Sequence, residues 1–309
     1  MQTTAAVRRA ATWHRPLMIL VAAMAILTVV TAVGVFTDDR GLLGAPIWLK
    51  PFKFSVSILL YGLTLAWMIS LLPRRGRLVT WPAVVITGSL VVEMIVIVAQ
   101  VIRGETSHYN ESTPLNAALW QAMGAAIMIL FVAHFIIGVA VLRARIPDRV
   151  SRTGVALGLG VSMLGLVAAF PMVMPSMSGG IEVAGAHTAG AADGGPGLPV
   201  VGWSTVAGDL RIGHFVGLHA LQALPLLAWA LTRFATRLSE RTKVRLLVVA
   251  GAGYAGLTGL LTWQALREQP LIHPDALTLT AFGILAAVVL GGAGMIIRSD
   301  RRSEMELAA

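Results

Sequence analysis

The chain has 309 residues, of which 56% are hydrophobic and 13% are charged, and its mean hydropathy is +0.78. Soluble domains carry about 25% charged residues, so this composition excludes soluble enzymes, disordered chains and secreted disulfide scaffolds. The sequence contains no cysteine, which excludes thiol catalysis, cysteine-ligated clusters, cysteine zinc sites and attachment of c-type haem. The composition therefore indicates a protein whose main solvent is lipid.

Eight apolar segments are long enough to cross a bilayer as helices. A hydrocarbon core about 30 Å thick requires roughly 20 apolar residues at 1.5 Å per residue. The runs are continuous, whereas a membrane β-barrel shows short alternating segments, so we expect an all-α, polytopic helix bundle. The predicted spans cover about residues 17–36, 54–72, 78–102, 117–142, 154–174, 214–233, 244–266 and 276–297.

Basic residues are divided unequally between the two sides of the predicted bundle. With the N-terminus in the cytoplasm, 18 Lys and Arg residues lie in inner segments and six in outer segments. This asymmetry follows the positive-inside rule and predicts a cytoplasmic-membrane protein with both termini in the cytoplasm. The net charge of +9 therefore reflects topology, and we expect no nucleic-acid partner. The inner groups include Arg8, Arg9, Arg15, Arg74, Arg75, Arg77, Arg143, Arg145, Arg149, Arg298 and Arg301.

One long loop, residues 175–213, interrupts the series of predicted spans and is rich in Gly, Ala and Ser. Such a composition is typical of a flexible connector, because glycine-rich segments gain little packing energy. The alternative is a lid over a site on the outer side of the membrane. Residues 1–297 are expected to form a single transmembrane domain, and residues 298–309 a disordered cytoplasmic tail.

Two of the predicted helices end alike. One ends in Gln100-Val101-Ile102-Arg103 and the other in Gln264-Ala265-Leu266-Arg267. This similarity favours two parallel four-helix halves, 1–145 and 146–297, related by an internal repeat. The alternative is chance similarity between apolar helices that end in a cation.

Glycines within the predicted spans are expected to let neighbouring helices approach closely, since small residues favour such contacts in lipid. The residues concerned are Gly154, Gly158, Gly160, Gly256, Gly259, Gly291, Gly292 and Gly294.

Glu93 is the outstanding polar residue within the spans. It lies about nine residues below the outer end of its helix, roughly 14 Å deep at 1.5 Å per residue. Ionisable groups at such depth are costly and are candidates for function. An ionised carboxylate there requires a cation, or it stays protonated. Glu93 is predicted either to titrate or bind substrate, or to be a neutral carboxyl that locks two helices together.

Other polar side chains gather in the outer half of the predicted bundle, with Lys50 and Lys53 as further cations. They predict a cavity open to the extracytoplasmic side, where cations could meet a polar or anionic ligand. For each cation alone, snorkelling to lipid headgroups is the alternative. His134, nearer the inner side, is expected to be a core residue. The candidate binding or pathway residues are Glu93, Gln100, Arg103, His108, Gln121, His214, His219, Gln222, Gln264 and Arg267.

These features favour binding or transport of a small polar or anionic solute, with Glu93 as the titrating group if protons are coupled. A rival hypothesis is a membrane-embedded enzyme or redox protein in which His108, His214 and His273 hold a metal or haem. The spacing of these histidines is not specific for a metal. A third hypothesis is a non-catalytic subunit of a membrane complex. The sequence identifies no cofactor and no oligomeric state.

Three stretches, Lys50–Ser55, Arg103–Asn110 and His214–Gln222, resemble segments of a family of bacterial multi-pass membrane proteins with no assigned activity. The resemblance covers about 23 residues and implies neither an activity nor a cofactor. It selects the same outer stretches as the depth of the polar residues does.

Overall fold

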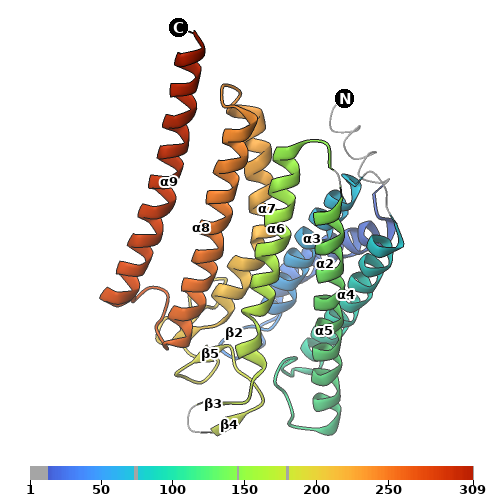
Figure 1. Cartoon of the computed structure of the whole chain (residues 1–309). Coiled ribbons are helices and arrows are strands. Elements are labelled where there is room, and N and C mark those ends of the chain that lie inside the picture. Colours follow the sequence, from blue (N-terminus) through green and yellow to red (C-terminus); the bar gives the residue numbers. More distant parts are fainter. Residues whose placement is uncertain (1–12, 73–75, 145, 179–180, 309) are drawn as a thin grey trace. The chain divides into compact units, whose positions relative to one another are not determined.

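The computed structural model describes residues 13–72, 76–144, 146–178 and 181–308 (Figure 1). Within them, eight helices are long and apolar enough to cross a membrane, which confirms the predicted number of spans and indicates a multi-pass membrane protein. Of the inner basic residues, Arg8, Arg9, Arg74, Arg75 and Arg145 lie outside the described residues. The helices are α2 (Arg15–Thr37), α3 (Leu49–Ser70), α4 (Arg77–Arg103), α5 (Pro114–Arg143), α6 (Arg149–Val167), the short 3-10 helix η1 (Phe170–Val173), α7 (Arg211–Phe234), α8 (Glu240–Leu266) and α9 (Ala276–Ala308).

The ends of several helices follow from local sequence chemistry. Thr113, Asp148 and Ser239 precede α5, α6 and α8, and each side chain accepts a hydrogen bond from a backbone N–H of the first turn. Such N-caps satisfy donors that have no partner within the helix. At the other end of α4, Gly104 adopts a left-handed conformation with φ of 75°, which turns the chain out of the helix.

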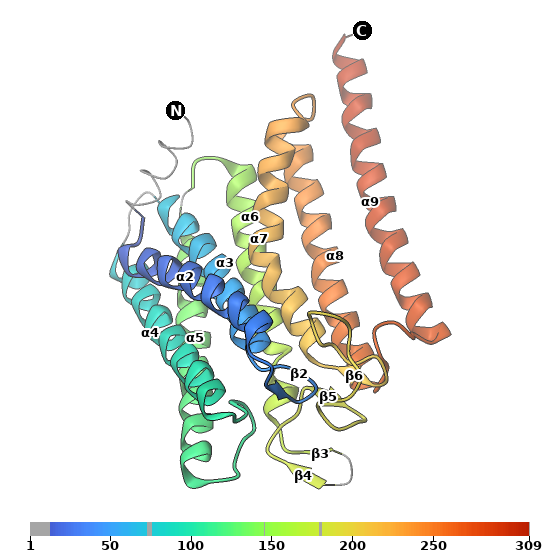
Figure 2. The ribbon, with the colours of Figure 1, turned by 180° about the vertical axis from the view of Figure 1, so that it is seen from behind.

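The chain divides into two compact units. The first unit comprises Met1–Ala144 and Val173–Val206, and in it α2 packs on α3 and α4, and α4 packs on α5. The second unit comprises Arg145–Met172 and Ala207–Ala309, and in it α7 packs on α6 and α8, and α8 packs on α9 (Figure 2). This division differs from the predicted halves chiefly because most of the long loop belongs to the first unit.

The long loop has local structure of its own. Two short strands within it, β3 (Ser176–Ser178) and β4 (Ile181–Val183), pair in an antiparallel hairpin. Farther on, a β-bridge joins Gly197 to Ser204. The loop is thus folded rather than a structureless connector. The remaining strands are β1 (Gly41–Leu42), which pairs with β2 (Ala45–Pro46), and the two-residue segments β5 (Thr188–Ala189) and β6 (Gly208–Asp209).

Helix α3 begins earlier than the hydropathy predicts, at Leu49 instead of residue 54. The indole Nε1 of Trp48, the residue before the helix, donates to Asp38 Oδ2 at 2.7 Å and fixes the entry of the chain. Pro51 is tolerated because the N–H groups of a first helical turn have no intrahelical acceptor. Lys50 and Lys53 therefore lie on the first turns of a helix and not in a loop.

Helix α9 extends past residue 297, where the sequence leads us to expect a disordered tail, and ends at Ala308. Asp300 accepts hydrogen bonds from Ser239 Oγ at 2.7 Å and from Thr242 Oγ1 at 2.5 Å. These contacts tie α9 to the first turn of α8. The segment after Arg298 also contains neither Gly nor Pro, so nothing in it breaks the helix.

Glycines bring α6 and α7 close together in the second unit. A Cβ atom built on Gly154 would lie 2.6 Å from the Cβ of Ala228, and one built on Gly217 would lie 2.5 Å from the Cα of Gly165. The predicted role in close packing is confirmed for Gly154 and Gly158. It is wrong for Gly160, as it is for Gly259, Gly291 and Gly294, because a Cβ at each of these meets no atom within 4 Å.

We expect Gly165→Ala to destabilise the protein by about 1–3 kcal/mol, because the added methyl group overpacks the α6–α7 contact. The matched control is Gly160→Ala on the same helix, where the methyl group enters open space. The measurement is the free energy of unfolding of each variant in detergent. Equal values for the two variants would contradict the close approach.

Candidate functional site

The first unit brings Glu93 of α4 into contact with His108 of the loop that follows α4. Glu93 Oε1 lies 3.6 Å from His108 Nε2, and the two side chains are 4% and 15% exposed. Among the described residues, the other oxygen of this carboxylate, Oε2, is buried without a hydrogen-bond partner. The carboxyl group therefore faces a ring supplied by a loop. The alternative of a carboxyl hydrogen-bonded to a neighbouring helix is not seen in the described part of the chain.

The second ring nitrogen of His108 fixes the tautomer of the neutral imidazole. Lys50 Nζ and Ser107 Oγ each lie 3.1 Å from His108 Nδ1. An ammonium group can only donate a hydrogen bond, so Nδ1 is the acceptor. The proton of the neutral ring is then on Nε2, the nitrogen that faces Glu93. Lys50 thus donates to one nitrogen of the ring, and the N–H of the other nitrogen faces the carboxylate of Glu93 at 3.6 Å.

Four rings surround the imidazole of His108. Their centroids lie 5.5 Å away for Trp120, 5.8 Å for Phe54, 6.0 Å for Tyr109 and 6.3 Å for His187. Burial, and then the positive charges of Lys50 and His187, hold the pKa of His108 well below its usual range. The ring is therefore neutral at pH 7, which agrees with the tautomer inferred from its contacts.

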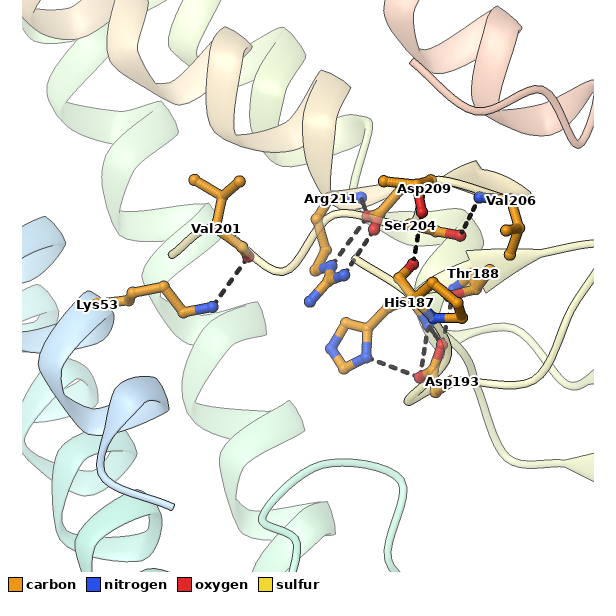
Figure 3. A network of polar contacts seen from close by, with 11 residues as sticks. Lys53, His187, Thr188, Asp193, Val201, Ser204, Val206, Asp209 and Arg211 are labelled. Atoms are coloured by element: carbon orange, nitrogen blue, oxygen red, sulfur yellow. Dashed lines mark hydrogen bonds and ion pairs between the residues drawn. The ribbon is translucent and has the colours of Figure 1, made fainter. Parts of the chain in front are cut away.

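His187 reaches this cluster from the long loop and is held there by Asp193 (Figure 3). Asp193 Oδ2 lies 2.8 Å from His187 Nδ1, and Asp193 Oδ1 accepts from the backbone N–H of Thr188 at 2.9 Å. Burial raises the pKa of Asp193, but the hydrogen bonds and the charge of His187 outweigh it, so the pKa lies below the usual range. Lys53 Nζ donates to Val201 O at 3.0 Å, which fastens the loop to α3.

Sequence reasoning missed the part that His187 and Asp193 play. They are the two ionisable side chains between residues 184 and 206. Their isolation in a Gly-rich segment could have indicated a specific contact between them. A flexible connector does not require a His and an Asp six residues apart. The sequence indicates Lys50 only as one of several outer cations, since its contact with His108 spans 58 positions in the chain.

Gln100 and Arg103 fasten the end of α4 to the start of α5. Gln100 Nε2 donates to Thr106 O and to Asn116 Oδ1, at 3.1 Å each. Arg103 donates to Gln100 Oε1 at 2.5 Å and to Asn116 Oδ1 at 2.9 Å. Their described contacts are thus with the helix ends and not with the Glu93–His108 pair.

Gln264 and Arg267 form a similar fastening in the second unit. Gln264 Nε2 donates to Pro270 O at 2.9 Å, six residues on, as Gln100 does to Thr106. Arg267 pairs with Asp275 at 2.6 Å and donates to Thr278 Oγ1 at 2.9 Å. The hydrogen bond from Arg267 contributes most to holding the pKa of Asp275 below its usual range. The internal repeat stays a prediction, and these two helix ends are built alike.

Of the other candidate residues, Gln121 belongs to the first unit, and His214, His219, Gln222 and His273 belong to the second. His214 Nδ1 lies 2.8 Å from Gly165 O, which links α7 to α6, and His219 Nδ1 lies 3.3 Å from Gln222 Oε1 on the same helix. Gln121 and His273 are exposed.

His134 is fully buried, and its Nδ1 lies 2.8 Å from the hydroxyl of Tyr61. This environment is that of the core residue expected from the sequence. Among the described residues, no group of three or more His, Asp or Glu side chains is arranged to hold a metal ion. A hollow of about 490 Å³ lies against α4 and α5, but its lining is apolar and includes Trp81, Val85 and Met128.

The fluorescence of Trp120 should report the protonation of His108, because an imidazolium ring quenches a neighbouring indole. We expect no quenching of this component near pH 7 in the unchanged protein. Removing the charge in Lys50→Met favours the imidazolium, raises the pKa of His108 and moves the onset of quenching to higher pH. The measurement is a pH titration of emission, corrected with Trp120→Phe.

Arg40→Gln is the control for this titration, since Arg40 pairs with Asp38 and not with His108. An onset of quenching at the same pH in Lys50→Met as in the unchanged protein would show that Lys50 does not influence the ring.

Comparisons of the chain with family models, with curated proteins and with solved structures found no match. The function is therefore inferred from the chemistry of the cluster formed by Lys50, Glu93, His108, His187 and Asp193, hereafter the histidine cluster.

Proposed function

We propose that this membrane protein binds a small polar or anionic solute and carries it across the bilayer, coupled to protons through Glu93 and His108. The observation that supports the proposal is a buried carboxylate in α4 with an imidazole nitrogen 3.6 Å away. Ionisable residues within membrane spans mark proton relays and substrate pathways, because burying them without a function is costly.

The contacts of Glu93 favour a changing protonation state over a purely structural role. A structural carboxyl group is expected to have partners for both oxygens, as most buried polar groups do. Oε2 of Glu93 has no hydrogen-bond partner among the described residues. Its ionised form relies on the positive charge of Lys50 and on the N–H of His108. The balance between the two forms therefore responds to any proton or ligand that reaches the cluster.

The surroundings of the histidine cluster favour a polar or anionic solute. Lys50 places a positive charge at its centre, 3.1 Å from His108 Nδ1. The long loop reaches the same cluster with His187 and is fastened by Lys53 to Val201 O. These contacts of the loop with the cluster and with α3 support the lid interpretation over the flexible connector.

We further propose that the protein lies in the cytoplasmic membrane, with both termini in the cytoplasm and the histidine cluster on the outer side. The support is the distribution of basic residues, 18 of which fall in the segments assigned to the inside and six in those assigned to the outside. In this orientation the long loop and His108 meet the extracytoplasmic solution.

A protonated carboxyl group has a characteristic C=O stretching band, so infrared difference spectra can follow Glu93 directly. We expect a band that appears as the pH is lowered, and Glu93→Gln should remove it. Glu105→Gln is the matched control, because Glu105 lies in the loop after α4 and accepts from Asn110 Nδ2 at 3.1 Å. Identical spectra for the Glu93→Gln variant and the unchanged protein would refute titration of Glu93.

The proposed orientation can be tested by cysteine labelling, since the chain has no cysteine of its own. A cysteine at Gly195 in the long loop should react with a membrane-impermeant maleimide in intact cells. A cysteine at Thr236, which is exposed between α7 and α8, should react only after the membrane is opened. The reverse labelling pattern would show that the topology is opposite to the one proposed.

A further inference from the structure

We propose that Lys50 supplies the proton that reaches Glu93, and that the proton passes through the ring of His108. This inference rests on the proposed function, in which Glu93 changes its protonation state, and adds the donor and the route. Lys50 Nζ lies 3.1 Å from His108 Nδ1, and His108 Nε2 lies 3.6 Å from Glu93 Oε1. The imidazole therefore stands between a donor and an acceptor, with one nitrogen turned to each.

The transfer is balanced in protons. One N–H bond of the Lys50 ammonium breaks as a bond forms at His108 Nδ1, and the Nε2–H bond breaks as Glu93 Oε1 gains the proton. The result is a neutral Lys50, a neutral His108 in its other tautomer and a protonated Glu93. Lys50 then regains a proton from water. For the reverse transfer Lys50 first gives its extra proton to water and becomes neutral. Glu93 Oε1 then returns a proton to His108 Nε2 as the N–H bond at Nδ1 breaks and Lys50 regains its ammonium form, which restores the first tautomer of the ring.

The burial of the three groups increases in the order of the proposed transfer, from Lys50 through His108 to Glu93. Lys50 is half-buried at the start of α3 and can exchange with solvent. The side chain of His108 is 15% exposed and that of Glu93 is 4% exposed. The gap of 3.6 Å has to shorten by a few tenths of an ångström for transfer, and such contacts are often long before a ligand is bound.

The charges around His108 disfavour a ring that stays protonated as imidazolium. They favour a ring that accepts one proton as it releases another. Lys50 faces it from α3, Glu93 from α4 and His187 from the long loop, while α5 contributes the uncharged ring of Trp120. Asp193 contacts His187, away from this ring. Lys50 and His187 both disfavour a lasting imidazolium. A transfer in which one proton enters as another leaves avoids that state.

Replacing Lys50 by Arg separates charge from proton donation. Arginine keeps the positive charge and its donors, but it does not give up a proton in proteins, whereas a buried lysine can. The measurement is the rate at which the carboxyl band of Glu93 appears after a rapid drop in pH, which starts for each variant from a pH at which the band is absent. Loss of a positioned proton donor typically lowers such rates by 10²–10⁴, so we expect about a hundredfold decrease in both Lys50→Arg and Lys50→Met. The final intensity of the band should remain, and Arg40→Gln should leave the rate unchanged.

Each result of this experiment decides the inference. A normal rate in Lys50→Arg would overturn it and leave Lys50 as a fixed charge, and a normal rate in Lys50→Met would overturn it as well. If neither variant folds, His108→Ala tests the route through the ring. Its slow transfer should be restored by free imidazole in the buffer, and a normal rate without imidazole would overturn the route. The absence of a Glu93 band in the unchanged protein would instead refute the proposed function, and with it this inference.

Discussion

A carboxyl group inside a membrane has no water to solvate it, and this constraint organises the polar structure of the first unit. Glu93 lies within the span formed by α4, so a polar partner has to reach it from another segment of the chain. His108 comes from the loop after α4, and Lys50 comes from the first turn of α3. The surrounding aromatic rings are less polar than water and so strengthen the effect of each remaining charge, since electrostatic interactions strengthen as the local dielectric constant falls.

Hydropathy alone predicts the eight spans, because the bilayer imposes one length and one composition on every helix that crosses it. It does less well at helix ends, where specific contacts decide. Trp48 and Asp38 start α3 five residues before its predicted beginning, and Asp300 holds α9 in helical form beyond its predicted end. In both cases a side-chain partner outside the helix contributes, ten positions away for Trp48 and Asp38 and 61 positions away for Ser239 and Asp300.

The candidate site is predictable in part for the same reason. The depth of Glu93 follows from counting residues, but its contact with His108 depends on how the following loop returns over the helix. Gln100 lies at a depth that suggests a pathway, yet its side chain is used to close the end of α4. His187 enters the cluster from a loop that is 79 positions beyond His108. Only the fold brings these two rings to a centroid distance of 6.3 Å.

Helix α9 is secured differently from the helices around the histidine cluster. Its most apolar window has no residue buried within the protein, and in the second unit it packs on α8. Polar contacts hold it at two levels, through Arg267 with Asp275 and Thr278 at its first turn, and through Asp300 with Ser239 and Thr242 toward its far end. The helix is therefore anchored by polar contacts toward both of its ends. Its outward-facing positions can therefore accept many substitutions as long as the side chains stay apolar. The residues that form the two sets of polar contacts tolerate few substitutions.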